Sequence, residues 1–291
     1  MYKKCYISYI DLDFVKDKFG ISCLYPTVNG GREYYSAWDN SKERIFNKLQ
    51  PDPYDPEGYF RGIGKGKIDG KGVLTMTGEH PRYYVYDRAR TLYWENVEIT
   101  CYCMRISEDE GSIHDFRLAA RTNHQDCEDI CNSCAQGYIF ELNFNGRIQF
   151  RKEVFHEKGY AEPLPVSVKK WWETNNGQVP KNTWIGMKFV VQTCDGGKHV
   201  RLEGYRDMSD GENGGDWGNP LIEYVDKGGW TSSDITEKMI KSCKDNEKCH
   251  DRMDKKDPII LRKGLSCYLR TDYSADAKFK KLSIREISSL P

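Results

Sequence analysis

Two short segments carry the side chains best suited to chemistry. Arg121, Asn123 and His124 lie together in the run RTNH, and Tyr268 opens the run YLRTDY. β-Elimination of a uronate needs a group that neutralises the carboxylate, a base for the adjacent proton and an acid for the leaving oxygen. Arg121 and Asn123 suit the first role, His124 suits the second, and Tyr268 or Tyr273 suits the third. The competing interpretation is structural, with His124 holding a loop carbonyl and Tyr268 packed as a ring.

Polar side chains recur on one face of four predicted strands. In segments 116–124, 138–144, 147–153 and 266–272, apolar and polar residues alternate, so every second side chain points to the same side. The polar side holds the predicted substrate-binding residues Arg117, Glu141, Asn143, Arg147, Gln149, Arg151, Arg270 and Asp272. Guanidinium groups bind carboxylates through paired hydrogen bonds, which suits an acidic polysaccharide. A solvated sheet face with cross-strand ion pairs is the alternative.

Two segments have the composition of metal sites. The loop after residue 206 is rich in oxygen ligands, and Asp207, Asp210 and Asp216 are the candidates for calcium, although Asp and Gly also form ordinary turns. The cluster Cys127-x3-Cys131-x2-Cys134 has the ligand type for zinc but not a standard spacing, so a disulfide-pinned loop is the favoured interpretation. The elimination chemistry itself requires no cofactor, and Ca²⁺ is the ion that the oxygen-rich loop would bind.

Cysteine usage bears on the compartment. Eleven cysteines exceed what a reducing cytosol usually retains, so we predict disulfides, including a local bridge from Cys243 to Cys249. The odd number leaves at least one thiol unpaired or joined to another chain, which makes an oligomer conceivable. We therefore expect an extracellular or a surface- or virion-associated protein, although the first twenty residues show no signal peptide.

Charge and hydropathy exclude two classes of partner. The chain has 44 basic and 44 acidic residues, and this balance argues against nucleic acid as the main partner. No stretch approaches the roughly 18 apolar residues of a membrane-spanning helix.

Turn signals are dense, and they separate short alternating runs. Further strands are predicted at 73–77, 82–86, 97–106, 184–193, 199–207, 221–225 and 278–287. Asn145-Gly146 and Asp195-Gly196-Gly197 each predict a hairpin. A short helix is predicted at 233–243, and residues 1–40 and 154–182 are predicted to be loops. We expect an all-β, two-sheet antiparallel sandwich forming one domain over 1–291, with an N-terminal extension and first strands in 1–45 and the sandwich body in 46–291.

Several motifs resemble a known group of proteins. In chain order they are NGGREYYSAWDN, PDPYDPEGYFRGIG, ARTNH, FNGRIQFRKE, PKNTWIGMKFVV and KFKKLSIREI. From about residue 19 to residue 287 the chain resembles an uncharacterised family of the concanavalin A-like lectin and glucanase superfamily, distantly similar to alginate-lyase-type polysaccharide lyases. This resemblance implies a jelly roll and carbohydrate binding.

The catalytic signatures of that superfamily are incomplete here. The hydrolase signature E-x-D-x-x-E is absent, which disfavours glycoside hydrolysis. The lyase signature R-[ST]-E-L is reduced to Arg121-Thr122-Asn123, Q-[IV]-H is absent, and YLRTDY replaces Y-F-K-x-G-x-Y. The sequence thus predicts recognition of an acidic polysaccharide, with cleavage by β-elimination as an open possibility. The alternatives are a non-catalytic, lectin-like module and a structural surface or virion protein.

Overall fold

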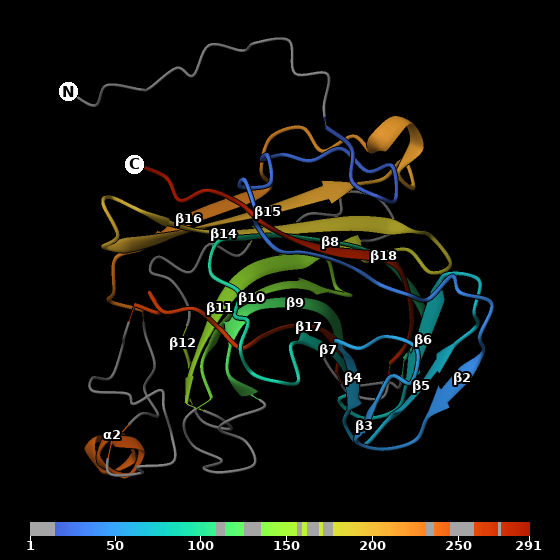
Figure 1. Ribbon diagram of the computed structural model, residues 1–291, viewed down its shortest axis with the longest axis horizontal. Coiled ribbons are helices and arrows are strands. Elements are labelled where there is room, and N and C mark those ends of the chain that lie inside the picture. The colour runs from blue at the N-terminus through green and yellow to red at the C-terminus, as the bar shows by residue number, and fades with distance from the viewer. Residues whose placement is uncertain are drawn as a thin grey trace.

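A computed structural model describes residues 15–108, 114–124, 135–155, 159–161, 169–170, 177–230, 236–244, 259–272 and 275–291. Two antiparallel β-sheets lie face to face in it (Figure 1). This arrangement confirms the predicted two-sheet sandwich of the jelly-roll kind.

The first sheet, called here the β14 sheet, has nine strands. Its order is β16 (Ile222–Asp226), β15 (His199–Asp207), β14 (Ile185–Cys194), β8 (Val97–Ser107), β18 (Asp276–Glu286), β6 (Val73–Thr77), β5 (Lys65–Ile68) and β2 (Arg44–Phe46). β1 (Glu33–Tyr35) also pairs with β18, beside the stretch that pairs with β6.

The second sheet, called the β9 sheet, also has nine strands. Its order is β12 (Gly159–Ala161), β11 (Arg147–Phe155), β10 (Gly137–Asn143), β9 (Asp115–Thr122), β17 (Ser266–Thr271), β7 (Arg82–Tyr86), β4 (Gly58–Arg61) and β3 (Gln50–Pro51). β13 (Lys169–Lys170) pairs with β11 as well.

Aromatic and aliphatic side chains from both sheets fill the space between them. The ring of Phe140 lies 5.9 Å from that of Phe189, and the ring of Phe116 lies 5.9 Å from that of Phe279, so each pair joins the two sheets. These residues are the apolar half of the alternation, and their polar neighbours consequently point away from the core.

Most predicted strands are confirmed to within one or two residues. β6, β7 and β15 match their predicted limits, and both predicted hairpins form, with Gly146 at φ 81° in the tight turn between β10 and β11. The helix predicted at 233–243 is confirmed in its second half by α2 (Glu237–Lys244), and a 3₁₀ turn, η2 (Glu212–Gly214), precedes β16. No helix in the described part of the chain is long and apolar enough to cross a membrane.

The prediction that the N-terminal forty residues form loops is wrong for β1 and is confirmed for residues 19–25, which hold only an isolated bridge at Ser22. β1 lies on β18, and residues 19–25 cover the outer face of the β14 sheet, where Ile21 packs with Tyr102 and Trp217. The buried Glu98 carboxylate holds this segment by accepting from the backbone N–H groups of Leu24 (3.1 Å) and Tyr25 (3.0 Å). Such short strands lack a repeating apolar pattern long enough to recognise.

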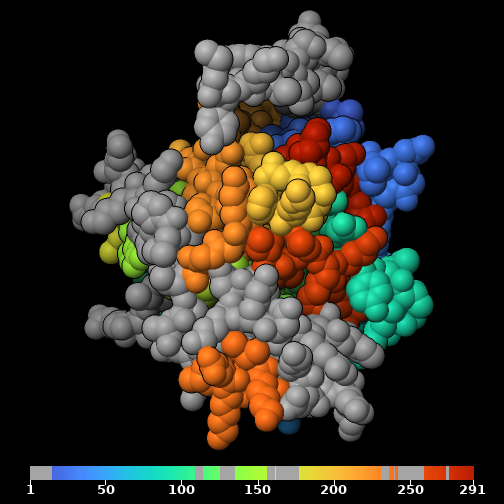
Figure 2. Space-filling model, turned by 90° about the vertical axis from the view of Figure 1, so that its left-hand side faces the viewer, coloured from blue at the N-terminus to red at the C-terminus, as the bar shows by residue number. Residues whose placement is uncertain are grey.

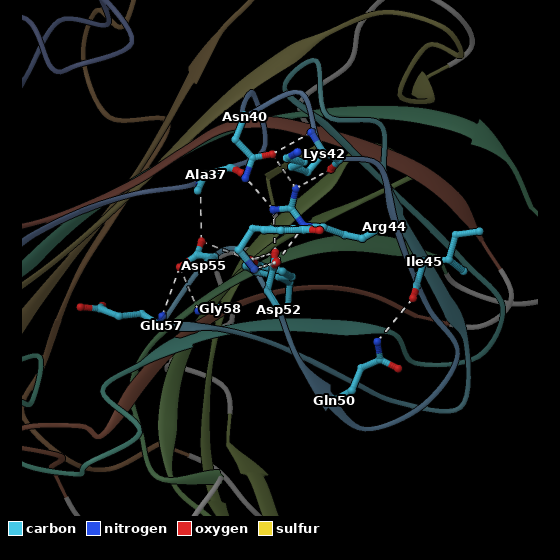
Figure 3. A network of polar contacts seen from close by, with 12 residues as sticks. Ala37, Asn40, Lys42, Arg44, Ile45, Gln50, Asp52, Asp55, Glu57 and Gly58 are labelled. Atoms are coloured by element: carbon cyan, nitrogen blue, oxygen red, sulfur yellow. Dashed lines mark hydrogen bonds and ion pairs between the residues drawn. The ribbon is translucent and has the colours of Figure 1, made fainter.

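A buried polar network fixes the PDPYDP turn at the β2–β3 end of the sandwich (Figure 3). Arg44 binds Asp52 through two contacts, at 2.7 and 2.8 Å, and donates a further hydrogen bond to the Ala37 carbonyl at 2.9 Å. The hydroxyl of Tyr34 donates to Asp55 at 2.6 Å. The turn that the sequence marks with three prolines is therefore anchored by its two aspartates.

The disulfide prediction fails for five cysteines. Cys23, Cys101, Cys103, Cys194 and Cys267 are buried and free, and burial raises the pKa of the Cys23 thiol to about 11. Apolar burial makes such thiols poor nucleophiles, and they act as small core residues. The bridge predicted for Cys243 and the cluster Cys127, Cys131 and Cys134 depend on residues outside the described part of the chain.

Candidate functional site

The outer face of the β9 sheet carries two parallel rows of side chains that cross the strands. The first, called the arginine row, follows the register of six strands: Arg61, Arg82, Arg270, Arg117, Glu141 and Gln149. The second, called the tyrosine row, lies two residues along each strand: Tyr59, Tyr84, Tyr268, Ala119, Ile139 and Arg151. A polar row and an aromatic row therefore lie side by side on one face.

Three rings meet where His124 contacts two tyrosines of the tyrosine row. Tyr84 and Tyr268 pack edge to face at 5.1 Å between centroids, and the His124 ring lies 5.6 Å from Tyr268 and 6.4 Å from Tyr84. The structure thus brings together His124 and Tyr268, the base and the acid predicted for elimination.

His124 has a carboxylate partner that the sequence analysis missed. Its Nε2 lies 2.5 Å from Oε2 of Glu153, and both side chains are buried. An ionised carboxylate accepts hydrogen bonds only, so Nε2 carries the proton and donates. Proton transfer by His124 to or from a ligand then falls to Nδ1.

Arg121 does not lie on this face, which corrects its predicted role. A β-bulge between β9 and β17 sets residues 120 and 121 opposite Cys267, and Arg121 adopts φ 52°. The bulge reverses the alternation, so that Thr122 faces Ser266 with a hydroxyl–hydroxyl distance of 2.8 Å. His124 remains on the ligand face because it follows the bulge.

The Arg121 side chain is instead buried, and its hydrogen bonds link three segments of the chain. It donates to the carbonyls of Glu95 and Ile260, both at 2.8 Å, and to Thr193 of the β14 sheet at 2.7 Å. Gly264 packs against the Arg121 backbone, since a Cβ at this glycine would lie 2.2 Å from the Arg121 Cα and carbonyl carbon.

Asn123 has a structural contact of its own. Its Oδ1 accepts from the backbone N–H of Gln136 at 2.6 Å, which continues the pairing of β9 with β10 beyond the last strand residue. The side-chain oxygen of Asn123 is therefore already engaged. That the side-chain NH₂ group of Asn123 neutralises the uronate carboxylate stays a prediction.

The predicted ligand-binding arginines are bound to carboxylates of the protein itself. Arg117 contacts Asp115 at 2.8 Å, Glu141 at 2.9 Å and Asp272 at 2.8 Å, and it is almost completely buried. Arg270 also pairs with Asp272. Both guanidinium groups are therefore oriented by internal partners, as the cross-strand ion-pair alternative predicts.

The remaining predicted residues line the same face around this network. Glu141 accepts from Gln149 at 2.6 Å and pairs with Arg151 at 3.2 Å. Asn143 and Arg147 lie at the hairpin end of β10 and β11, where the Asn143 amide is 3.5 Å from the Arg147 carbonyl. The structure thus brings all eight predicted binding residues to one face.

Crowding of carboxylates perturbs two acids in opposite directions. Burial, together with the nearby charges of Asp272 and Glu141, raises the pKa of Asp115 to about 7, although Arg117 acts to lower it. For Asp272 burial acts to raise the pKa, but Arg117, Arg270 and His80 outweigh it and hold the pKa below its usual range. Asp272 is therefore the stable anion of the pair at neutral pH.

The predicted calcium ligands do not form a cation site. Asp207 accepts from the backbone N–H groups of Gly211 (2.8 Å) and Asp216 (2.9 Å) and from the Tyr102 hydroxyl (2.7 Å), so its oxygens organise the loop. Asp210 pairs with Lys280 at 2.6 Å. Within the described ranges no group of three or more His, Cys, Asp or Glu residues could hold a metal ion.

Sequence reasoning missed Glu153, Tyr84 and Arg82 at this site. Arg82 and Tyr84 were predicted to lie in a strand, but nothing in the sequence placed β7 beside β17. Glu153 ended a predicted strand, and its alternation with Arg151 was the one signal that could have found it.

Comparisons with known proteins give only distant likenesses. No family profile and no curated protein matches the chain. Among solved structures, a Bacillus subtilis protein of unknown function with a galectin-like fold has 10% identity and a TM-score of 0.41, covering 89% of this chain and 99% of its own. The VIP36 exoplasmic/lumenal domain in its Ca²⁺/Man3GlcNAc-bound form has 10% identity and a TM-score of 0.41, with 87% and 90% covered.

A third structure, alginate lyase Aly36B, has 11% identity and a TM-score of 0.39, covering 88% of this chain and 98% of its own. Likeness at this level does not extend to a shared activity or a shared site.

Proposed function

We propose that the outer face of the β9 sheet binds an acidic polysaccharide and that His124 and Tyr268 cleave it there by β-elimination. The observation that carries this proposal is the contact of a Glu153-oriented imidazole with the Tyr268 ring, immediately beside the arginine row.

The two rows suit a polymer laid across the strands. Neighbouring strands are about 4.8 Å apart, so successive side chains of each row recur at that spacing. Tyrosine rings offer flat apolar faces to sugar rings, while guanidinium groups in the adjacent row bind carboxylates. A chain of uronate units could therefore contact both rows at once.

Guanidinium groups are numerous on this face. The arginines of this face are Arg61, Arg82, Arg117, Arg147, Arg151 and Arg270. The carboxylates that contact them are Asp115, Glu141 and Asp272, while Glu153 pairs with His124. A face rich in guanidinium groups suits an anionic ligand, because these groups bind carboxylates through paired hydrogen bonds.

The chemistry assigns one role to each group. His124 takes the proton from the carbon beside the uronate carboxylate, and the electron pair left behind forms a carbon–carbon double bond as the glycosidic C–O bond breaks. Tyr268 gives its proton to the departing oxygen. Arg82 and Arg270, which face each other in the row next to Tyr268, replace Arg121 as the groups that neutralise the carboxylate.

Burial sets a condition on this reaction. His124 is 0% exposed and Tyr268 is 2% exposed, whereas Tyr59 and Arg61 at one end of the rows and Arg151 at the other are partly exposed. A polymer can therefore contact the ends of the rows directly, but it reaches the central rings only if the protein opens locally over them.

The test is incubation of the protein with alginate, glucuronan, pectate and glycosaminoglycans while following the ultraviolet absorbance of the new conjugated double bond. We expect a rise on at least one polymer, abolished by His124→Asn and by Tyr268→Phe. His199→Asn, on the β14 sheet, and Tyr93→Phe, at an exposed position outside the two rows, are the matched controls and should leave the rate unchanged.

Binding without cleavage is the second candidate, and the complete burial of His124 favours it. A flat absorbance trace on every polymer, combined with measurable affinity for one of them, would exclude the lyase and leave this candidate.

A further inference from the structure

A separate cavity lies beside β18 in the other sheet. Its volume is about 210 Å³. The residues that give it its chemical character are Phe19, Ser36, Trp38, Lys71, Lys280 and Lys281. Two aromatic residues, one serine and three lysines therefore line one space, together with Asp39.

The cavity lies where β18 changes its partner strand. β1 pairs with β18 as far as Tyr35 opposite Ser283, and β6 begins with Val73 opposite Lys280. The pairing of β18 with β8 is also irregular between Lys280 and Ser283. Residues 281 and 282 thus pass between two strand ends, and this leaves room for the cavity.

The backbone at Lys281 is in a conformation that favours glycine. Its φ is 52°, in the left-handed region that β-carbons disfavour. The irregularity directs two successive lysines to the same side of the sheet, since the Lys280 and Lys281 ammonium groups lie 5.9 and 5.4 Å from the Tyr102 ring centroid. Strained residues of this kind cluster at ligand sites.

The lysines are unequally neutralised. Lys280 pairs with Asp210 at 2.6 Å and lies over the Trp184 ring at 4.2 Å. Neither Lys71 nor Lys281 has a carboxylate within ion-pair distance in the described part of the chain, although Asp39 lies on the cavity wall. The cavity is therefore positively charged next to a buried Trp38.

We propose that this cavity binds a sugar that carries a sulfate or phosphate ester. Lys71 and Lys281 contact the ester oxygens, because compact ammonium groups act as point charges toward such tetrahedral anions. Ser36 supplies a hydroxyl, and Phe19 and Trp38 offer apolar surface to the sugar ring. This site is independent of the arginine and tyrosine rows and lies in the opposite sheet.

The experiment is calorimetric titration of the full chain with glucose 6-sulfate, glucose 6-phosphate, inorganic sulfate, inorganic phosphate and glucose. We expect one or both esters to bind at least tenfold more tightly than the matching free ion, and glucose not to bind. The tighter ester identifies the natural group. Equal affinity for the ester and its free ion, or no binding of either ester, would overturn the proposal.

Variants locate the site. Lys281→Asn keeps a residue that tolerates the left-handed conformation but removes the charge, and together with Lys71→Gln it should weaken ester binding at least tenfold. Lys278→Gln is the matched control, because Lys278 lies on the same strand but does not line the cavity. Unchanged affinity in Lys281→Asn would contradict the assignment.

Lys281→Gly separates binding from folding. Glycine relieves the positive φ, so this variant should unfold at a higher temperature than the natural chain while losing ester affinity. Retained affinity in this stably folded variant would overturn the role of Lys281.

Discussion

At the scale of single residues, the β9 face is governed by how Arg117 distributes its charge among three carboxylates. A buried guanidinium needs partners, and Asp115, Glu141 and Asp272 supply them within 2.9 Å. Three carboxylates so close together also repel one another. One of them, Asp115, is consequently driven toward its protonated form.

Asp115 should make the protein less stable as the pH rises. Its pKa in the fold is about 7, above the ordinary value of 3.8, so the folded state binds the proton more tightly than the unfolded state does. The contribution of Asp115 to the free energy of unfolding is fully present below about pH 4 and is lost by about pH 7. Over this range the free energy of unfolding falls by up to about 1.4 kcal/mol per pH unit. Asp115→Asn should remove this loss, which urea unfolding across that pH range will measure.

The exposed Asp39→Asn is the control for that experiment, and its free energy of unfolding should follow the natural chain at every pH. Parallel curves for Asp115→Asn and the natural chain would show that Asp115 does not titrate in this window.

Glu153 acts as a positioning residue for His124 in the proposed reaction. Glu153→Gln should lower kcat about 10- to 100-fold, as the loss of a partner that orients an imidazole commonly does. The Glu153 carboxylate favours the protonated form of the imidazole. Its loss should therefore also lower the apparent pKa of the catalytic base in the pH–rate profile. Asp195→Asn removes the equivalent partner of the exposed His199 and should change neither quantity. A reduced kcat with an unmoved profile would indicate a purely structural role for Glu153.

At the scale of elements, the strands are predictable and their irregularities are not. Alternation placed β9, β10, β11 and β17 and their polar faces correctly, because each strand buries one side. The bulge at residue 121 has no sequence signal, since a residue with positive φ is usually glycine and here it is arginine. The Arg121 prediction therefore failed, although the prediction of its strand was correct.

Arg121 should prove to be a stability residue. Its guanidinium satisfies two carbonyls and the Thr193 hydroxyl in a buried setting, so Arg121→Lys leaves acceptors unpaired and should cost about 2–4 kcal/mol in urea unfolding. Arg147→Lys, at a half-buried position on the hairpin, should cost less than about 0.5 kcal/mol. A loss below 1 kcal/mol for Arg121→Lys, on about the same scale as the control, would contradict this account.

At the scale of the whole molecule, polar ties lie at both ends of the sandwich. One end holds the Arg44 and Asp52 network around the PDPYDP turn (Figure 3). The other end holds Arg121 and the 195–198 turn, which lies beside the C-terminal residues (Figure 2). The Asp195 N–H of this turn donates a hydrogen bond to the Pro291 carbonyl at 3.1 Å. Because these polar contacts hold the loops at both ends of the sandwich, the proposed ligand sites lie on the sheets and not at the ends.

The sequence could indicate the polar face but not its internal charge pairing. Which carboxylate meets which guanidinium depends on the strand order β10-β9-β17-β7, which brings residues 82, 117 and 272 together from distant parts of the chain. Local alternation carries no information on that order. The tyrosine and arginine rows are therefore visible only once the sheet is assembled.

The most direct test of the central claim is the affinity of the protein for acidic and neutral polysaccharides, measured by affinity electrophoresis at low and high salt. We predict retardation by at least one uronate polymer, weakened by salt and by the double change Arg61→Gln with Arg82→Gln, and unaffected by Lys278→Gln on the other sheet. Equal mobility of the natural chain in every uronate gel and in a gel without polymer would contradict the claim that this face binds an acidic polysaccharide.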